Sequence, residues 1–397
     1  MEKRLETQAS ITMFNFTSLP PLSLYIHVPW CIKKCPYCDF NSHKSPEALP
    51  EHAYVDALIH DLEQEVPYIW GRTVQSIFIG GGTPSLFSAE AYERLFSSIR
   101  ALLPLSPHVE ITLEANPGTF EAQRFADYRA LGINRLSIGI QSFNDQSLTT
   151  LGRIHNRQQA IKAVETAHKV GFENFNLDLM FGLPHQTEKT AQHDIDTAIS
   201  LSPSHISYYQ LTMEPNTLFY QQPPKLPDED NIIDWQLANQ DRLAKAGYIQ
   251  YEISAYAQDN KQCQHNINYW KFGDYIGIGA GAHGKISDAS KQSITRRSKQ
   301  KQPQKYLETA GSQTVIQTEE KISKKDIGFE FMLNALRLTD GFPTPLFYQH
   351  AGLPISHIDQ ALQQAEQQQL LTRDIHFIRP TEKGLRYLNT LIELFLP

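Results

Sequence analysis

Three cysteines stand close together early in the sequence, Cys31, Cys35 and Cys38, in the run LYIHVPWCIKKCPYCDF. Their C-x3-C-x2-C spacing supplies one thiolate too few for a tetrahedral zinc site, and no histidine or fourth cysteine follows at the usual distance. Three thiolates can instead hold three irons of a [4Fe-4S] cube and leave the fourth iron open to a small-molecule ligand. The motif therefore predicts an iron–sulfur cluster with an open iron rather than a zinc knuckle.

Length and composition bound the class of protein. The chain has 397 residues, 41% of them hydrophobic, which is enough for a large core and suggests two domains. No apolar run approaches the ~20 residues of a membrane-spanning helix, and the first residues lack the apolar region of a secretory signal. Four cysteines, three of them clustered, are typical of a reducing cytosol. We expect a cytoplasmic protein with no transmembrane segment, for which a peripheral membrane contact stays open.

Short apolar segments alternate with amphipathic ones between residues 23 and 211. The amphipathic segments, which predict helices, include Tyr54–Val66, Ala89–Leu103, Glu121–Leu131, Gln158–Val170 and Thr190–Leu201. The expected strands are Leu24–Val28, Ser76–Ile79, Glu110–Glu114, Arg135–Ile140, Phe175–Met180 and His205–Leu211. Strands that alternate with helices at this spacing are typical of parallel βαβ units with right-handed crossovers. Six such units predict an α/β fold in the form of a partial, open (β/α)6 barrel. A doubly wound open sheet is the alternative, because the sequence alone does not fix the strand order.

One face of the expected strands is repeatedly polar. This face carries Tyr25, His27, Thr112, Glu114, Ser137, Gln141, Asn176, Asp178, Ser207 and Tyr209. Successive side chains of a strand point to opposite faces, so this set lies together on one side of the sheet. Strands of a closed parallel barrel are usually apolar on both faces. A polar inner face therefore predicts a lined cavity instead of a packed core.

A glycine-rich run, GGGTPS, follows the second expected strand and contains Gly81, Gly82 and Thr83. Consecutive glycines let a backbone approach a ligand closely and expose its amides. The run is no phosphate loop, because no Gly-Lys-Ser/Thr follows. Alone it is equally typical of an ordinary turn.

Polar residues also lie at or near the carboxyl ends of three expected strands: Glu114, Gln141 and Asp178. Barrel enzymes place their functional groups at these strand ends. A carboxylate that faces a lumen needs a partner, such as a ligand hydroxyl, an ammonium group or Arg153. The set favours a ligand pocket over three separate structural hydrogen bonds.

The pattern changes after Leu211. Residues 221–230 read as a proline-rich acidic loop, and the polar, basic residues 288–305 predict an exposed loop or linker. Residues 324–397 contain three helical patterns, Asp326–Leu338, His357–Gln369 and Glu382–Leu396, and the stretch LLTRDIHFIRP between the last two predicts a small β wing. The end of the chain therefore predicts a winged-helix-like helical module.

Six segments together resemble the oxygen-independent coproporphyrinogen III oxidase family of radical S-adenosylmethionine (SAM) proteins. They are LYIHVPWCIKKCPYCDF, FIGGGTPS, LEANPGT, LSIGIQSFND, LGRIH and NFNLDLMFGLPHQT, in the order found in that family. The resemblance is specific from about residue 22 to 215 and continues more weakly to the C-terminus. It implies a partial (β/α)6 radical SAM barrel, a C-terminal mixed α/β extension and the small winged-helix-like module.

The resemblance also implies site residues and domain limits. Cys31, Cys35 and Cys38 correspond to the ligands of the [4Fe-4S] cluster, and the implied SAM contacts are Tyr25, Tyr37, Gly81, Gly82, Thr83, Glu114, Gln141, Arg153 and Asp178. The expected division is an N-terminal extension over 1–21, the barrel core over 22–215, the α/β extension over 216–310 and the C-terminal module over 311–397. No residue is assigned a catalytic role.

Two branches of this family differ in function. The coproporphyrinogen dehydrogenases carry a further cysteine two positions after the third, where this chain has Phe40, and they have a longer N-terminal arm. A second branch, of heme chaperones, has the phenylalanine, the short start and an H-N-x-x-Y-W signature, present here as HNINYW from His265 to Trp270. This branch implies heme as a further cofactor.

His265 is the expected heme residue, because an imidazole is a good axial ligand of heme iron and the nearby aromatic rings can contact a porphyrin. Without the resemblance, HNINYW is more typical of an aromatic-packed structural corner. The neighbouring Cys263 is expected to be a buried structural thiol.

These observations favour heme binding and delivery to an unidentified acceptor protein, in a chain that carries a [4Fe-4S] cluster and exchangeable SAM. The first alternative is an enzyme that oxidatively decarboxylates two propionates of coproporphyrinogen III. A third class, radical SAM modification of RNA, is disfavoured because the basic run 291–305 lacks interleaved aromatics in a chain of net charge −7. We expect no nucleic-acid partner.

Overall fold

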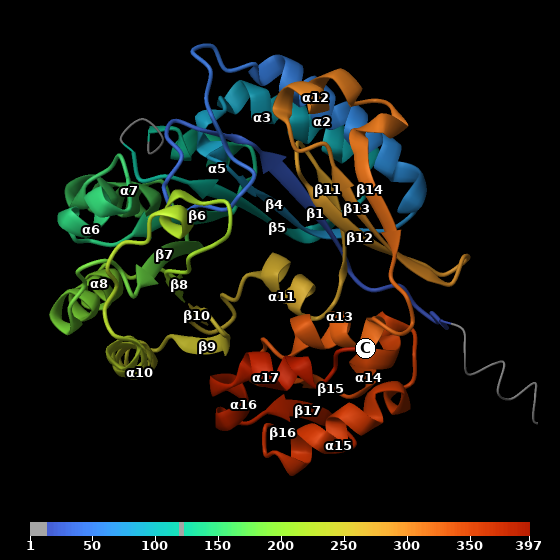
Figure 1. The fold of residues 1–397 in the computed structure, drawn as a ribbon. Helices are drawn as coiled ribbons and strands as arrows, with labels where there is room; N and C mark the ends of the chain where they lie inside the picture. The colour runs from blue at the N-terminus through green and yellow to red at the C-terminus, as the bar shows by residue number, and fades with distance from the viewer. Residues whose placement is uncertain (1–13, 119–122) are drawn as a thin grey trace, which may run out of the picture.

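The computed structural model describes residues 14–118 and 123–397, so residues 1–13 of the expected N-terminal extension lie outside it. Its centre is a row of six parallel strands in sequence order (Figure 1). They are β1 (Leu22–Val28), β4 (Val74–Gly81), β5 (Leu105–Ala115), β6 (Arg135–Gln141), β7 (Phe175–Phe181) and β8 (His205–Gln210). The six predicted strands are thus confirmed, with ends shifted by a few residues. Because the order never reverses within the six, the doubly wound alternative is wrong.

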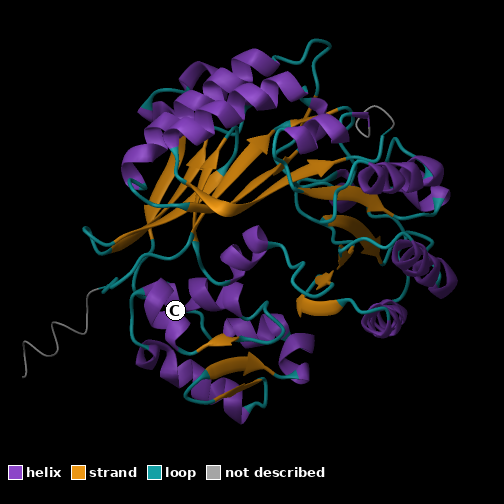
Figure 2. Cartoon of the chain, turned by 180° about the vertical axis from the view of Figure 1, so that it is seen from behind, coloured by secondary structure: helices purple, strands orange, loops and turns teal. Residues whose placement is uncertain are grey.

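Helices cover the outer face of this row, as Figures 1 and 2 show from opposite sides. They are α2 (Glu51–Glu65), α3 (Ala89–Leu102), α5 (Phe125–Ala130), α6 (Asp145–Thr150), α7 (Arg157–Lys169), α8 (Glu188–Ser200) and α10 (Glu229–Lys245). The outward side chains of the strands, such as Leu113, Leu136 and Leu177, are fully buried against them. The apolar face of each strand therefore makes the core, and the polar face is left to the inside of the curve. Part of the helix that the sequence predicts over Glu121–Leu131 lies outside the described residues.

The sheet continues beyond the six strands on both sides, in the order β14-β13-β12-β11-β1-β4-β5-β6-β7-β8-β10-β9. The added strands are β9 (Ile249–Glu252), β10 (Ala255–Ala257), β11 (Asp274–Ile278), β12 (His283–Asp288), β13 (Ser293–Lys299) and β14 (Ile316–Lys321). In the described part of the chain, the two ends of this order are not hydrogen-bonded to each other. The expected partial, open barrel is confirmed.

The prediction of an exposed loop or linker over residues 288–305 is wrong. The middle of this segment is strand β13, paired antiparallel with both β12 and β14, and its end is the start of helix α12 (Pro303–Thr309). The physical reason is the alternation of its side chains: Ile294 and Ser298 are buried on one face, whereas Lys299 is buried on the other. The basic strand β13 can be partly buried because its lysine and arginine side chains pair with acidic residues of a helix that is distant in sequence.

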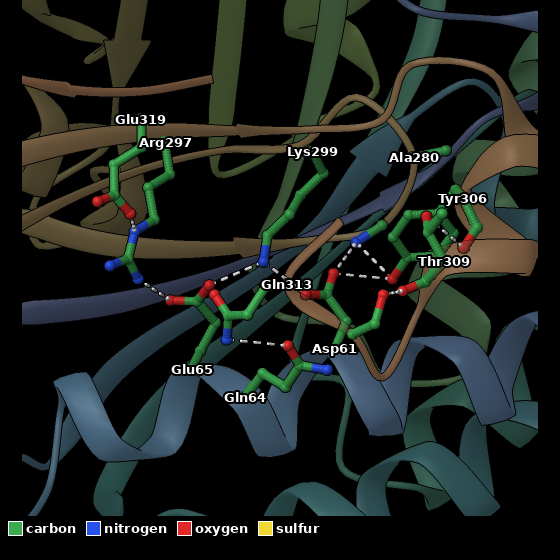
Figure 3. Close-up of polar contacts among 12 residues, drawn as sticks. Asp61, Gln64, Glu65, Ala280, Arg297, Lys299, Tyr306, Thr309, Gln313 and Glu319 are labelled. Atoms are coloured by element: carbon green, nitrogen blue, oxygen red, sulfur yellow. Dashed lines mark hydrogen bonds and ion pairs between the residues drawn. The ribbon is translucent and has the colours of Figure 1, made fainter. Parts of the chain in front are cut away.

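Those acids lie on α2, and the contacts are drawn in Figure 3. The Lys299 ammonium is 2.5 Å from Asp61 Oδ1 and 2.7 Å from Glu65 Oε1, and all three side chains are at most 5% exposed. Arg297 Nη1 donates to the other Glu65 oxygen at 3.5 Å and Arg297 Nε to Glu319 at 2.6 Å. This network fixes the extension strands to the first helix of the barrel.

The last part of the chain forms a module with its own apolar cluster. Its helices are α13 (Ile327–Ala335), α14 (Pro345–Ala351), α15 (Asp359–Gln367), α16 (Glu382–Arg386) and α17 (Leu388–Glu393), and its strands β15 (Phe342–Pro343), β16 (Leu371–Arg373) and β17 (Phe377–Pro380) form a small sheet. The predicted wing is the β16–β17 pair. The helix predicted over 382–396 is broken at Tyr387, whose φ of −111° and ψ of 45° are not helical.

A short helix, α11 (Gln264–Trp270), lies between the concave face of the main sheet and α13 in both views (Figures 1 and 2). It closes the bottom of the curved sheet. The remaining short elements are β2 (Trp30–Cys31), β3 (His43–Lys44), α9 (Leu218–Gln221) and the 3-10 turns Val66–Tyr68, Pro84–Leu86, Gln313–Val315 and Ile355–Ile358. Among the described helices, none has the length and apolar character needed to cross a bilayer.

We predict that Lys299→Met destabilises the chain by roughly 3–5 kcal/mol, because it leaves the buried Asp61 carboxylate without a cation and leaves Glu65 with only the longer contact to Arg297. The measurement is the free energy of unfolding in urea. The matched control is Arg94→Met, which breaks an exposed pair with Asp56 and should cost under about 1 kcal/mol. Equal effects of the two substitutions would contradict the structural role of the network.

Candidate functional site at the open end of the sheet

The cysteine loop follows β1 and lies over the carboxyl ends of the strands. Cys31 ends β2, and Cys35 and Cys38 lie on one turn, with the Cys38 N–H donating to the Cys35 carbonyl at 3.2 Å. All three thiols are partly exposed, and all three line one cavity of about 420 Å³. This volume falls in the range of ~300–1,000 Å³ typical of small-molecule sites.

The glycine run forms the wall of this cavity at the end of β4. The Gly82 N–H donates to the Val28 carbonyl and the Thr83 N–H to the Trp30 carbonyl, both at 2.7 Å, so the run is tied to the strand that leads into the cysteine loop. Gly81 has a φ of +111°, and a Cβ there would lie 2.5 Å from the His27 ring. A Cβ at Gly82 would lie 2.5 Å from the Trp30 carbonyl oxygen. Only glycine fits at both positions.

Two carboxyl groups face the cavity from the strands. Glu114 Oε2 accepts the Gly81 N–H at 3.0 Å. Asp178 accepts hydrogen bonds from Ser137 at 3.0 Å and from Asn176 at 2.8 Å. Burial raises the pKa of Asp178, and burial together with the charge of Asp178 raises the pKa of Glu114 to about 8. The pocket therefore favours a positively charged or hydroxyl-bearing ligand, which would partner these groups.

Gln141 and Arg153 complete the rim. Gln141 has a φ of +69° at the end of β6, and its Oε1 accepts the Tyr209 hydroxyl at 2.7 Å. Arg153 Nη2 donates to the Gly139 carbonyl at 2.8 Å, and Arg153 Nη1 lies 3.8 Å from the Cys35 sulfur. Its Nε has no partner in the described chain.

Asn116 is a cavity residue that the sequence analysis missed. Its amide donates to Thr83 Oγ1 at 2.9 Å and its carbonyl accepts from Arg153 at 2.6 Å, so it joins the glycine run to the arginine. The signal was present in the sequence, since Asn116 follows Glu114 by two residues in the segment LEANPGT.

The cavity brings together most of the expected site residues but not all of them. Lining it are Cys31, Cys35, Tyr37, Cys38, Gly81, Gly82, Thr83, Glu114, Gln141, Arg153 and Asp178. Tyr25 lies deeper, where its hydroxyl is 3.0 Å from His27 Nδ1. His265 on α11 is 1% exposed, below the cavity, with Nδ1 3.0 Å from the Ser76 hydroxyl. Cys263 is fully buried, as expected for a structural thiol.

The cysteine loop fits an iron–sulfur cube better than a mononuclear site. Over residues 14–118 and 123–397, no three His, Cys, Asp or Glu side chains are grouped to hold one metal ion. In a [4Fe-4S] cube each cysteine binds a different iron, so three cysteines are spread over three of the four metal atoms. Three thiols around one cavity, with a glycine wall beside them, suit that arrangement and leave room for a ligand on the fourth iron.

An open (β/α)6 sheet with a three-cysteine loop over its strand ends defines a radical SAM protein, and the Radical SAM superfamily model matches residues 25–198. The HemN C-terminal domain model matches residues 322–387. Heme chaperone HemW of Escherichia coli is 49% identical over 95% of this chain and 99% of its own length, and HemW of Haemophilus influenzae is 49% identical over 95% and 98%. The chain belongs to the HemW family.

A solved structure extends the likeness to the whole fold. Coproporphyrinogen III oxidase (HemN) of Escherichia coli, described as a radical SAM enzyme, superposes with a TM-score of 0.80 and covers 95% of this chain and 90% of that one. The two sequences are 23% identical, so this likeness supports the fold alone.

We predict that Glu114→Gln removes part of the pH dependence of stability in cluster-free protein. Because the folded pKa lies above the unfolded one, the folded state binds more protons between about pH 4.5 and pH 8, and wild-type stability falls as pH rises through that window. The variant should gain roughly 2–4 kcal/mol relative to wild type at pH 8.5 and little at pH 4.5. Urea unfolding at both pH values is the measurement. The exposed Glu173→Gln is the control, and parallel pH profiles of wild type and Glu114→Gln would contradict the assignment.

Proposed function

We propose that this chain is a heme chaperone, which binds heme and transfers it to an acceptor protein. The observation that carries the proposal is the 49% identity to heme chaperone HemW over nearly the full length of both chains. The described residues also form an open cavity at the strand ends, where a cofactor and a ligand could be held together.

In this function the cavity would hold a [4Fe-4S] cluster and SAM. Cys31, Cys35 and Cys38 would hold the cluster. The residues offered as SAM contacts are Tyr25, Tyr37, Gly81, Gly82, Thr83, Glu114, Gln141, Arg153 and Asp178. The glycine amides and the two carboxyl groups suit the polar groups of SAM, and Arg153 can donate two parallel hydrogen bonds to a carboxylate. When bound, the cluster and SAM supply one-electron chemistry.

Phe40 supports a chaperone over the decarboxylating enzyme. It lines the cavity beside Cys38 and is 57% exposed, an unusual position for a large apolar side chain. The dehydrogenase branch of the resemblance places a cysteine there. This chain presents an apolar ring in its place and so lacks a fourth thiol in the loop.

His265 as a heme-iron ligand stays a prediction. In the conformation described here the ring is packed 5.1 Å from Phe78 and 4.8 Å from Tyr269, centroid to centroid. Coordination of iron by His265 would therefore require α11 to move away from β4. We further propose a cytoplasmic location, with peripheral membrane contact during transfer. We keep the proposed domain limits at 21/22 and 215/216, whereas the pairing of β14 with β13 carries the extension past the expected limit of 310/311 to residue 321.

We predict that the triple substitution of Cys31, Cys35 and Cys38 by alanine abolishes the cluster, because the site then has no thiolate ligand. Iron and sulfide are measured after anaerobic reconstitution. Cys263→Ala is the matched control and should retain the wild-type content. Four irons per chain in the triple variant would refute the assignment.

We also predict that reconstituted protein binds heme and forms no protoporphyrinogen from coproporphyrinogen III when supplied with SAM and a reductant. Heme binding is followed by the Soret band, and the decarboxylated product by chromatography in the same preparation. His265→Ala should shift or weaken the Soret band if the imidazole ligates iron. Stoichiometric product without measurable heme affinity would favour the enzyme alternative.

A further inference from the structure

Below the cavity, the inner face of the sheet carries a buried arginine that has no hydrogen-bond or ion-pair partner among the described residues. Arg135 lies on β6, 2% exposed, and its side chain makes no hydrogen bond or ion pair with any other described residue. Strand register places Tyr25, Phe78, Thr112 and Arg135 in one row across β1, β4, β5 and β6. We call this row, with His265 beside it, the lumen floor. It lies two residues below Glu114 and Ser137, which line the cavity, or roughly 7 Å along the strand.

Two acids near Arg135, Glu110 and Asp178, already accept hydrogen bonds from other groups. Glu110 Oε1 accepts the N–H groups of Gln264 and His265 at 2.9 and 3.2 Å, which fixes the start of α11. Asp178 is bonded to Ser137 and Asn176. Neither acid comes within 4.0 Å of the guanidinium. Burial lowers the pKa of Arg135, and the nearby Cys263, followed by Glu110, Tyr251 and Asp178, raises it. A buried cation without a paired anion costs several kcal/mol, so a partner is expected.

Two further donors of the floor are unused. Thr112 Oγ1, the cross-strand neighbour of Arg135, is buried without a hydrogen bond among the described residues, and so is His265 Nε2. The proton on His265 can be placed. The Asn268 amide donates to the Ser23 hydroxyl at 2.9 Å, which leaves the Ser23 hydrogen for Ser76 at 2.8 Å and the Ser76 hydrogen for His265 Nδ1 at 3.0 Å.

If the hydrogen bonds from Ser23 to Ser76 and from Ser76 to His265 ran in the opposite direction, the Ser23 hydroxyl hydrogen would have no acceptor among these groups. The Nε2 atom of His265 therefore carries the ring proton. Burial and the charge of Arg135 lower the pKa of His265 to about 3, so the ring is neutral. The floor thus offers a cation and two neutral donors, and a group with only acceptor atoms would satisfy them.

We propose that the lumen floor binds one carboxylate, held by Arg135 with Thr112 and His265 beside it. The carboxylate is either a propionate arm of a porphyrin in the cavity above or a small free carboxylate. The porphyrin source rests on the proposed function. The site itself does not, because it follows from the unpaired guanidinium.

The first test locates the anion with bromide as the probe. Crystals of the full chain soaked in sodium bromide should give an anomalous peak beside Arg135, and crystals of Arg135→Met should not. Thr112→Val, which removes one hydroxyl and keeps the shape, is the variant to use if Arg135→Met fails to fold, and should weaken the peak. Absence of a peak in wild type would mean that water fills the floor and would overturn the proposal.

The second test compares heme with its dimethyl ester, which has no free carboxylate. Heme should bind roughly 10- to 100-fold more tightly than the ester to wild type, and Arg135→Met should lose this preference, whereas the exposed Arg157→Met should keep it. Bromide binding without that preference assigns the floor to a small free carboxylate. Bromide binding in a protein with no heme affinity would refute the proposed function but would still support the anion site beside Arg135.

Discussion

Glu114 and Asp178 are carboxyl groups on the inner face of a parallel sheet, and the need to keep such groups hydrogen-bonded is the constraint on which the rest of the structure depends. Asp178 is satisfied by neighbouring strands through Ser137 and Asn176, whereas Glu114 depends on the Gly81 N–H. The bond between Glu114 and the Gly81 N–H forms only because residue 81, at the end of β4, is a glycine, since any side chain there would collide with the His27 ring. The carboxylates, the glycine run and the start of the cysteine loop are therefore one connected unit.

The same constraint explains why the sheet stays open at one end and closed at the other. At the top, the polar groups line a cavity where a ligand can partner them. At the bottom, α11 covers the sheet, and Glu110 accepts its first N–H groups. Lys299, Asp61 and Glu65 hold the extension strands against α2 in the same way, by pairing charges that neither element could bury alone.

The barrel strands could be predicted from local patterns, because the residues that identify each strand are adjacent in sequence. The polar inner face, for example, could be read from alternation within β5 and β7. The extension could not be predicted in this way. Lys299 reads as a solvated cation until Asp61 is placed beside it, and the two are 238 residues apart in sequence. His265 shows the same limit: its motif suggested a heme ligand, whereas its packing against Phe78 and its bond to Ser76 depend on strand β4, nearly two hundred residues earlier.

The central claim is that the three-cysteine loop and the strand-end carboxylates form one site, in which SAM binds the open iron of a [4Fe-4S] cluster. Electron paramagnetic resonance of the reduced, reconstituted protein with and without SAM tests it most directly. SAM should change the spectrum of wild type, and Asp178→Asn should need a higher SAM concentration for the same change. Identical spectra with and without saturating SAM in wild type would contradict the account.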